Sequence, residues 1–173
     1  MYRYMQSEAS RAGAEWYRVI EMEGITMDGN GYVLFVCVHG SAKSLIAMQY
    51  FNRFSAERGL ASRAFSAGIE PDDTVPTEVV EGLHADGIDV INYRPQRVTA
   101  TLVAGAEHIV SFGPGLDEFL APGGRVAQWE DMPLVSDDYA IARDAIVARV
   151  RLMFQREESA ARGSADVLQP RTS

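Results

Sequence analysis

Apolar segments alternate with amphipathic segments along the chain, which is the pattern of an α/β protein. Residues 32–37 (YVLFVC) are an unbroken apolar run rich in β-branched and aromatic side chains, typical of a strand buried on both faces. From Ser44 to about Arg58 the apolar residues recur at helical spacing, and Gly59 follows as a stop signal. The first unit is therefore predicted to be a strand, a tight loop and a helix.

The same alternation continues to the end of the pattern. Three more apolar segments predict strands, and one segment that opens with proline predicts a short helix. The longest periodic segment, Asp138 to about Arg156, predicts an amphipathic closing helix. Together these elements predict an α/β fold with a four-stranded parallel sheet and helices on both faces, which holds ligands beyond the carboxyl ends of its strands. The three further strands and the short helix are residues 62–66, 107–112, 125–129 and 76–85.

The pattern also predicts how the chain is organised. Residues 1–31 are polar and rich in methionine, with a short helix around residues 15–22, and we interpret them as an N-terminal extension. Residues 32–157 form the α/β domain. Residues 158–173 are rich in Ala, Ser and Arg and are predicted to be a disordered tail. We expect neither a signal peptide nor a membrane span, because no apolar run has the required length or flanks.

Composition and charge narrow the range of functions. The 173 residues are 47% hydrophobic and 23% charged, as in one soluble domain, and the formal net charge is −8. This acidic balance argues against nucleic acid as a partner, since protein surfaces that bind the negatively charged phosphates of nucleic acid are rich in Lys and Arg. Cys37 is the only cysteine, so no internal disulfide forms and a cytoplasmic location is expected. One cysteine and three scattered histidines provide no metal-ligand spacing, and no cofactor is predicted.

The candidate chemistry lies in the segment CVHGSAKS, between the predicted strand and helix. A tight loop that enters a helix directs several backbone N–H groups toward one point, and the helix dipole adds partial positive charge there. This field and the nearby ammonium of Lys43 would both favour the thiolate of Cys37. The pattern predicts a nucleophilic thiol facing a tetrahedral oxyanion. The predicted oxyanion-binding residues are Val38, His39, Gly40, Ser41, Ala42, Lys43 and Ser44.

A nucleotide-binding loop is the rival interpretation of this segment. Aligning Lys43 and Ser44 with the motif G-x-x-x-x-G-K-[ST] puts Cys37 and Ala42 where that motif has glycine. We therefore do not expect nucleotide binding.

The segment VLFVCVHGSAKS followed by a helix resembles the low-molecular-weight protein tyrosine phosphatases and their relatives, the cysteine-based arsenate reductases. Four later segments resemble the same family in the correct order, so that the resemblance covers about residues 32–156. It implies that Cys37 is the nucleophile, that residues 38–43 hold the phosphate and that the Ser44 hydroxyl stabilises the thiolate. The four later segments are FSAGIEP, HADGID, EHIVSF and WEDMP.

The sequence departs from the family pattern at three positions. The family's general acid is an aspartate in the loop after the fourth strand, and here Asp131 stands one residue earlier, with Asp137 and Asp138 as further candidates. Lys43 replaces the signature arginine, which keeps the charge and loses a planar fork for two phosphate oxygens. Gly40 stands where the family often has asparagine, and glycine adopts a left-handed turn without steric cost.

These features leave three functions open. The first is hydrolysis of a phosphomonoester, on a phosphorylated protein or a small molecule, through a cysteinyl-phosphate intermediate. The second is arsenate reduction with an external thiol, because this chain has no second cysteine to resolve an adduct on Cys37. The third is a noncatalytic module that binds an oxyanion or a phosphoprotein, which the Lys43 and Asp131 departures favour.

Overall fold

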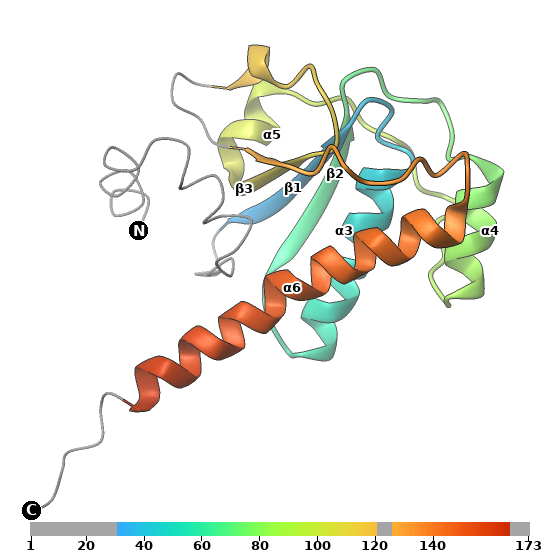
Figure 1. Ribbon diagram of the computed structural model, residues 1–173. Coiled ribbons are helices and arrows are strands. Elements are labelled where there is room, and N and C mark those ends of the chain that lie inside the picture. The colour runs from blue at the N-terminus through green and yellow to red at the C-terminus, as the bar shows by residue number, and fades with distance from the viewer. Residues whose placement is uncertain (1–30, 121–125, 167–173) are drawn as a thin grey trace, which may run out of the picture. The chain divides into compact units, whose positions relative to one another are not determined.

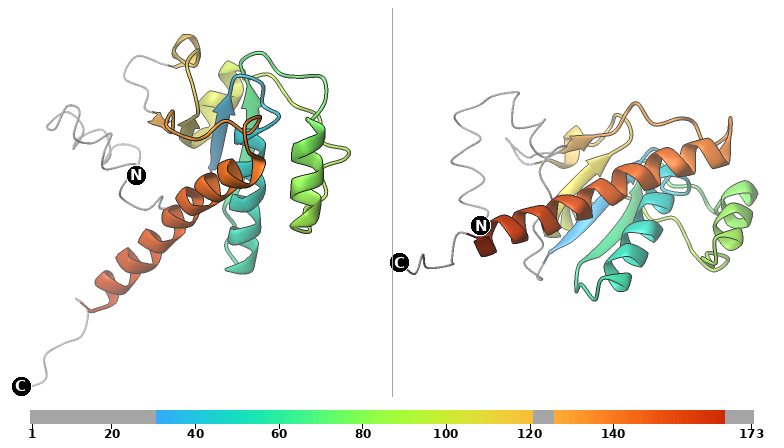
Figure 2. Two further views of the ribbon diagram at one scale, coloured as in Figure 1. Left: turned by 45° about the vertical axis from the view of Figure 1, so that its right-hand side comes forward. Right: turned by 60° about the horizontal axis from the view of Figure 1, so that its bottom comes forward.

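The computed structural model describes residues 31–120 and 126–166. Its centre is a sheet of four parallel strands in the order β2-β1-β3-β4. β1 (blue in the figures) lies between its two neighbours, and the chain turns from its carboxyl end into α3 (Figures 1 and 2). The predicted fold class is confirmed. The strands are β1 (Tyr32–Cys37), β2 (Arg63–Gly68), β3 (Ala106–Ser111) and β4 (Ala127–Gln128).

β1 is the hydrophobic centre because helices cover both faces of the sheet. Its side chains alternate, so Phe35 meets α3 (Lys43–Glu57) on one face, with its ring 6.1 Å from that of Phe51. On the other face Leu34 and Val36 belong to a buried cluster that packs against α5 (Ala100–Gly105). Burial on both faces explains why β1 is apolar at every position, and it fixes where the loop after Cys37 begins.

An ionic contact joins three helices on the α3 face of the sheet. Asp86, directly after α4 (Thr77–Ala85), accepts hydrogen bonds from the hydroxyl of Tyr50 on α3 at 2.6 Å and from the guanidinium of Arg143 on α6 (Tyr139–Asp166) at 2.8 Å. Burial alone would raise the pKa of Asp86, but these two hydrogen bonds lower it. Burial raises the pKa of neighbouring Tyr139 to about 12. The contact fixes the start of α6 beside α3.

Several boundaries differ from the predicted ones. α5 was not predicted; it is a helix of six residues whose first turn is capped by Thr99, which accepts a hydrogen bond from the Leu102 N–H. β4 pairs over two residues only, shorter than predicted. α6 continues to Asp166, where a disordered tail was expected from residue 158, because the Glu, Ala and Arg residues there favour helix. The predicted extension and its helix, and residues 167–173, lie outside the described residues.

The chain divides into two compact units. The sheet and the loop after β1 belong to the unit Met27–Leu152, and the described part of the other unit is the end of α6. A short 3-10 helix, η1 (Asp117–Phe119), follows β3. Over residues 31–120 and 126–166, no helix has the length and apolar character needed to span a bilayer.

Candidate active site

The loop after β1, residues Cys37–Ser44, is held in a tight turn by two glycines. Gly40 has a φ of 64°, in the left-handed region, as expected for glycine at this position. Its backbone packs directly against Gly68 at the end of β2, leaving no room for a Cβ atom on either residue. We call residues Cys37–Ser44 the Cys37 loop. Its shape therefore depends on the end of the neighbouring strand.

Two donors converge on the sulfur of Cys37. The backbone N–H of Gly40 lies 3.1 Å from Sγ, and the hydroxyl oxygen of Ser44, in the first turn of α3, lies 3.0 Å away. The Ser66 hydroxyl of β2 donates to the Ser44 oxygen at 2.9 Å, and because a thiolate has no proton, Ser44 is the donor to the sulfur when Cys37 is ionised. Such donors stabilise a thiolate more than a thiol. The geometry suits a nucleophilic sulfur.

The segment after β2 supports the Cys37 loop from outside. Three of its N–H groups donate to the carbonyl oxygens of Cys37, Val38 and His39. The carboxylate of Asp72 accepts a hydrogen bond from the buried hydroxyl of Ser41, and its other oxygen lies 3.3 Å from Nδ1 of His39. These hydrogen bonds hold three carbonyl oxygens of the loop against the segment after β2. The three donors are the N–H groups of Ile69, Glu70 and Asp72.

Two titratable side chains sense the charge of Cys37. Burial lowers the pKa of Lys43, and the negative charge of Cys37 opposes that shift. Burial also raises the pKa of Tyr93, partly offset by its hydrogen bond to Ser66, while the Cys37 charge adds to the rise. The hydroxyl of Tyr93 donates to the carbonyl of Ser66 at 3.4 Å. Lys43 comes from α3 and Tyr93 from the segment after α4, so two separate parts of the chain lie within the electrostatic field of Cys37.

The ammonium of Lys43 reaches a segment far away in the chain. Its Nζ donates a hydrogen bond to the carbonyl oxygen of Met132 at 2.8 Å. This contact brings the residue that follows Asp131 to the Cys37 loop. The predicted role of Lys43 in holding an oxyanion stays a prediction.

Asp131 points toward α6. Its two carboxylate oxygens accept hydrogen bonds from the guanidinium of Arg149 at 2.8 and 3.2 Å. The guanidinium also lies 5.5 Å from the ring centre of Trp129, a residue with 4% exposure. If Asp131 acts as the acid, its carboxyl group has to release the Arg149 guanidinium and contact the leaving oxygen of the substrate instead.

The reserve acids and the remaining loop residues have simpler surroundings. Asp138 caps α6, accepting a hydrogen bond from the N–H of Ile141 at 3.0 Å, and Asp137 lies in the preceding turn. Val38 is exposed at the rim of the loop, and Ala42 directly precedes α3. Neither Asp137 nor Asp138 has a contact that ties it to Cys37.

Four contributors to this site were not predicted from the sequence. Ser66, and Asp72 of the acidic pair Asp72–Asp73, were not among the candidate residues. Nothing in the local pattern distinguishes Tyr93 or Arg149, because their partners are distant in the chain. Among the described residues, no group of three or more His, Cys, Asp and Glu side chains is arranged to hold a metal ion.

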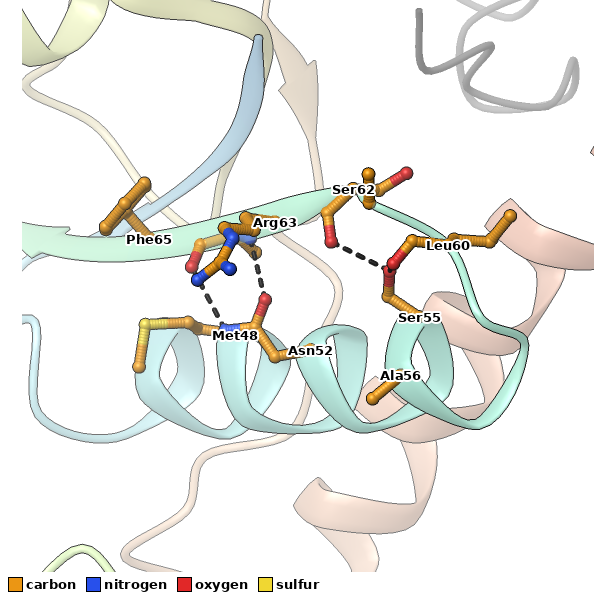
Figure 3. A pocket seen from close by; sticks show the side chains of 10 residues that line it. Met48, Asn52, Ser55, Ala56, Leu60, Ser62, Arg63 and Phe65 are labelled. Atoms are coloured by element: carbon orange, nitrogen blue, oxygen red, sulfur yellow. Dashed lines mark hydrogen bonds between the residues drawn. The ribbon is translucent and has the colours of Figure 1, made fainter. Parts of the chain in front are cut away.

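A separate groove of about 460 Å³ lies between α3 and β2, away from Cys37. Figure 3 shows Asn52 reaching from α3 to the strand, where its amide pairs with both backbone groups of Ala64 at 2.8 and 3.1 Å. The hydroxyl of Ser55 donates to the carbonyl of Ser62 at 2.7 Å. Met48 and Phe65 add apolar surface. The groove holds no candidate nucleophile, and its polar contacts join the helix to the strand.

Solved structures with the same fold come from phosphatases and arsenate reductases. YfkJ from Bacillus subtilis superposes with a TM-score of 0.66 at 17% identity, over 78% of this chain and 99% of that one. The low molecular weight protein tyrosine phosphatase from T. tengcongensis gives 0.56 at 23% identity, over 73% and 99%. The thioredoxin-dependent arsenate reductase of Corynebacterium glutamicum gives 0.61 at 22% identity, over 78% and 65%. At these identities the likeness establishes the fold.

The assignment of the chain to a family comes from its sequence. No curated protein matches the chain significantly. The model of the low molecular weight phosphotyrosine protein phosphatase family, in contrast, matches residues 32–121, which is more than half of the chain and includes the whole Cys37 loop. The chain therefore belongs to the low molecular weight phosphotyrosine protein phosphatase family.

Proposed function

We propose that this protein hydrolyses phosphate monoesters through a covalent intermediate on Cys37. The observation that carries the proposal is the pair of donors on its sulfur, from Gly40 and Ser44 at 3.1 and 3.0 Å. They lie at the entry to α3, where the helix dipole favours negative charge. Family membership supports the same chemistry. The substrate class is a phosphorylated protein or a small phosphomonoester.

The reaction has two steps. The thiolate of Cys37 attacks phosphorus, an S–P bond forms as the P–O bond breaks, and the leaving oxygen takes a proton from Asp131. Water then attacks the phosphocysteine while Asp131 accepts its proton, which releases inorganic phosphate and regenerates the thiolate. The Lys43 ammonium and the N–H groups of residues 38–43 other than that of Gly40, which contacts the sulfur, hold the phosphoryl oxygens in both steps.

Hydrolysis of an aryl phosphate by the wild-type protein and by Cys37→Ser tests this function. We expect turnover by the wild type and none by the variant, with phosphate affinity retained. Ser55→Ala is a matched control, because Ser55 is a buried serine whose hydrogen bonds run to the backbone of residues 60 and 62, away from the loop. Absence of activity in the wild type, or activity that survives Cys37→Ser, would overturn the proposal.

Arsenate reduction is a second candidate, supported by the fold shared with a thioredoxin-dependent arsenate reductase. Cys37 would form a covalent adduct with arsenate. An external thiol would then attack the Cys37 sulfur of this adduct, which releases arsenite and leaves a mixed disulfide between Cys37 and the external thiol. A second external thiol would then restore Cys37. An assay with monothiols, dithiols and thioredoxin tests this candidate, which fails if no donor supports arsenite formation.

The contacts of Lys43 and Asp131 favour a third candidate, a noncatalytic oxyanion or phosphoprotein binder. Each of these side chains is engaged by a protein group, Met132 and Arg149 respectively. Losing one well-aimed transition-state donor lowers turnover by about 100-fold to 1000-fold. If Lys43→Arg leaves a readily measured hydrolysis rate unchanged, the lysine does not impair catalysis. A large increase would identify the missing arginine geometry as the cause of slow turnover.

A further inference from the structure

Lys43 stands between the candidate nucleophile and the candidate acid. Its backbone begins α3, directly before Ser44, which contacts the Cys37 sulfur. Its ammonium extends to the Met132 carbonyl, 89 residues later in the chain. Across residues 31–120 and 126–166, no other hydrogen bond or ion pair joins the Cys37 loop to the residues around Asp131. Lys43 is thus the direct polar link between two parts of the site.

Residues 129–135, which we call the Asp131 segment, are fixed at both ends and held by polar contacts in between. Trp129 at one end is buried, and its N–H donates to Ser111 at 2.7 Å, while Val135 at the other end is also buried. Between them, Asp131 pairs with Arg149, and Met132 accepts from Lys43. Losing one of these contacts would allow the middle of the segment to move while its ends stay in place.

We propose that Lys43 is a positioning residue that couples an oxyanion in the Cys37 loop to the placement of the Asp131 segment. The inference rests on the proposed function. The Lys43 ammonium has three N–H donors, so it can hold a phosphate oxygen and the Met132 carbonyl at the same time, and a bound phosphate then fixes where Met132 and the adjacent Asp131 lie. A lysine suits this role because its ammonium is a point charge on a flexible stem, whereas the planar fork of arginine favours one fixed pairing. Lysine at this position provides a link that responds to the ligand.

Trp129 provides a reporter in the segment itself. The chain has two tryptophans, so Trp16→Phe leaves Trp129 alone, and its 4% exposure makes acrylamide quenching sensitive to any loosening. In this background we expect Lys43→Met to increase quenching several-fold. We also expect inorganic phosphate to change Trp129 fluorescence in the parent protein and to leave it unchanged in Lys43→Met, at concentrations that calorimetry shows to be saturating for each. Arg149→Met is the matched control: it removes the ion pair with Asp131 in the same segment, increases quenching and keeps the phosphate response.

Comparing the hydrolysis of two substrates gives a second test, whose result would differ if Lys43 contributed only its charge to phosphate binding. An acid out of position matters for phenyl phosphate, whose leaving group needs a proton, and matters little for 4-nitrophenyl phosphate. Lys43→Met should therefore lower kcat/KM, which reports the step in which the leaving group departs, at least about 10-fold more for phenyl phosphate than for 4-nitrophenyl phosphate, out of the 100-fold to 10,000-fold that acid catalysis contributes. A lysine that only binds phosphate would affect both substrates equally.

The outcomes separate this inference from the proposed function. Equal losses on both substrates together with unchanged quenching overturn the coupling and leave hydrolysis by Cys37 intact. A phosphate response that depends on Lys43, in a protein without hydrolytic activity, supports the coupling and overturns the function. Absence of phosphate binding in the parent protein overturns both.

Discussion

Gly40 and Gly68 pack back to back, so that a Cβ atom on either would lie 2.7 Å from the backbone nitrogen of the other. This contact sets the distance between the Cys37 loop and the end of β2. It also brings the Ser66 hydroxyl within reach of Ser44. The alignment of donors on Cys37 therefore depends on two residues without side chains.

Gly40→Ala is expected to destabilise the protein more than Gly59→Ala. Both glycines have left-handed φ values, 64° and 67°, but Gly59 has no atom within 4 Å of an added Cβ. The backbone strain of about 1–2 kcal/mol is common to both variants, and crowding at Gly40 adds about 1–3 kcal/mol. Urea unfolding monitored by circular dichroism measures the difference. Equal losses in the two variants would show that the loop moves away from Gly68 without penalty.

Ser44→Ala is expected to slow alkylation of Cys37 at pH 7. The variant removes a hydroxyl 3.0 Å from the sulfur, and a hydrogen bond to a charged group contributes about 1.5–3 kcal/mol. The rate with iodoacetamide should fall, because the variant removes a donor that stabilises the reactive thiolate. Single-site labelling is assured by the single cysteine. An unchanged rate would assign thiolate stabilisation to the Gly40 N–H and the helix instead.

Asp72→Ala is expected to lower the free energy of unfolding by about 1–3 kcal/mol, because the buried hydroxyl of Ser41 loses its acceptor. Asp73→Ala is the control: its side chain is exposed in the same acidic pair, and its effect should stay within about 0.5 kcal/mol. Thermal and urea unfolding of both variants provide the comparison. Similar stabilities would mean that Asp72 does not support the loop.

The titration of Lys43 is expected to respond to Cys37. Lys43 is the only lysine, so a protein grown with ¹³C-labelled lysine gives a single Cε resonance. Burial should put its pKa below the ordinary value of 10.5, and Cys37→Ser should lower it further, because the thiolate charge that raises it is lost. The same shift makes the protein more stable as the pH increases from the folded pKa toward 10.5, since the unfolded chain binds the proton more tightly there. Identical titrations in the two proteins would place Lys43 outside the field of Cys37.

Asp131→Asn tests the choice of acid. Hydrolysis of phenyl phosphate should fall by about 100-fold or more, with a smaller loss for 4-nitrophenyl phosphate. Asp137→Asn should leave both rates close to those of the wild type. Asp138→Asn keeps an N-cap residue on α6 and should behave in the same way. A selective loss in either of these controls would move the acid role away from Asp131.

The sequence predicted the fold because its strongest signal falls on the central strand. Residues 32–37 are apolar throughout, and burial between two layers of helices requires this pattern. α5 escaped prediction because six residues are too few to show a helical period, although Thr99 offered a capping signal. The end of α6 was misplaced because the apolar stripe stops before the helix does, and helix propensity alone continues it.

The nucleophile could be predicted and its surroundings could not. Cys37 and Ser44 lie within one continuous segment, so a local motif specifies them together. The contacts of Lys43 with Met132 and of Asp131 with Arg149 join residues 89 and 18 positions apart. No local periodicity encodes such pairs, because they form only when α6 and the Asp131 segment pack beside the sheet.

The outer edge of β2 limits how a polypeptide substrate could bind, because its backbone hydrogen-bonding groups are already occupied. The Asn52 amide occupies both backbone groups of Ala64, side chains occupy the carbonyl of Ser66, and Gly68 pairs with the backbone of residues 96 and 98. An extended peptide therefore finds no open row of backbone groups on this edge of the sheet. We expect a phosphorylated partner to be recognised mainly through the phosphorylated side chain that it inserts at Cys37. Backbone pairing of its neighbouring residues with β2 should contribute little.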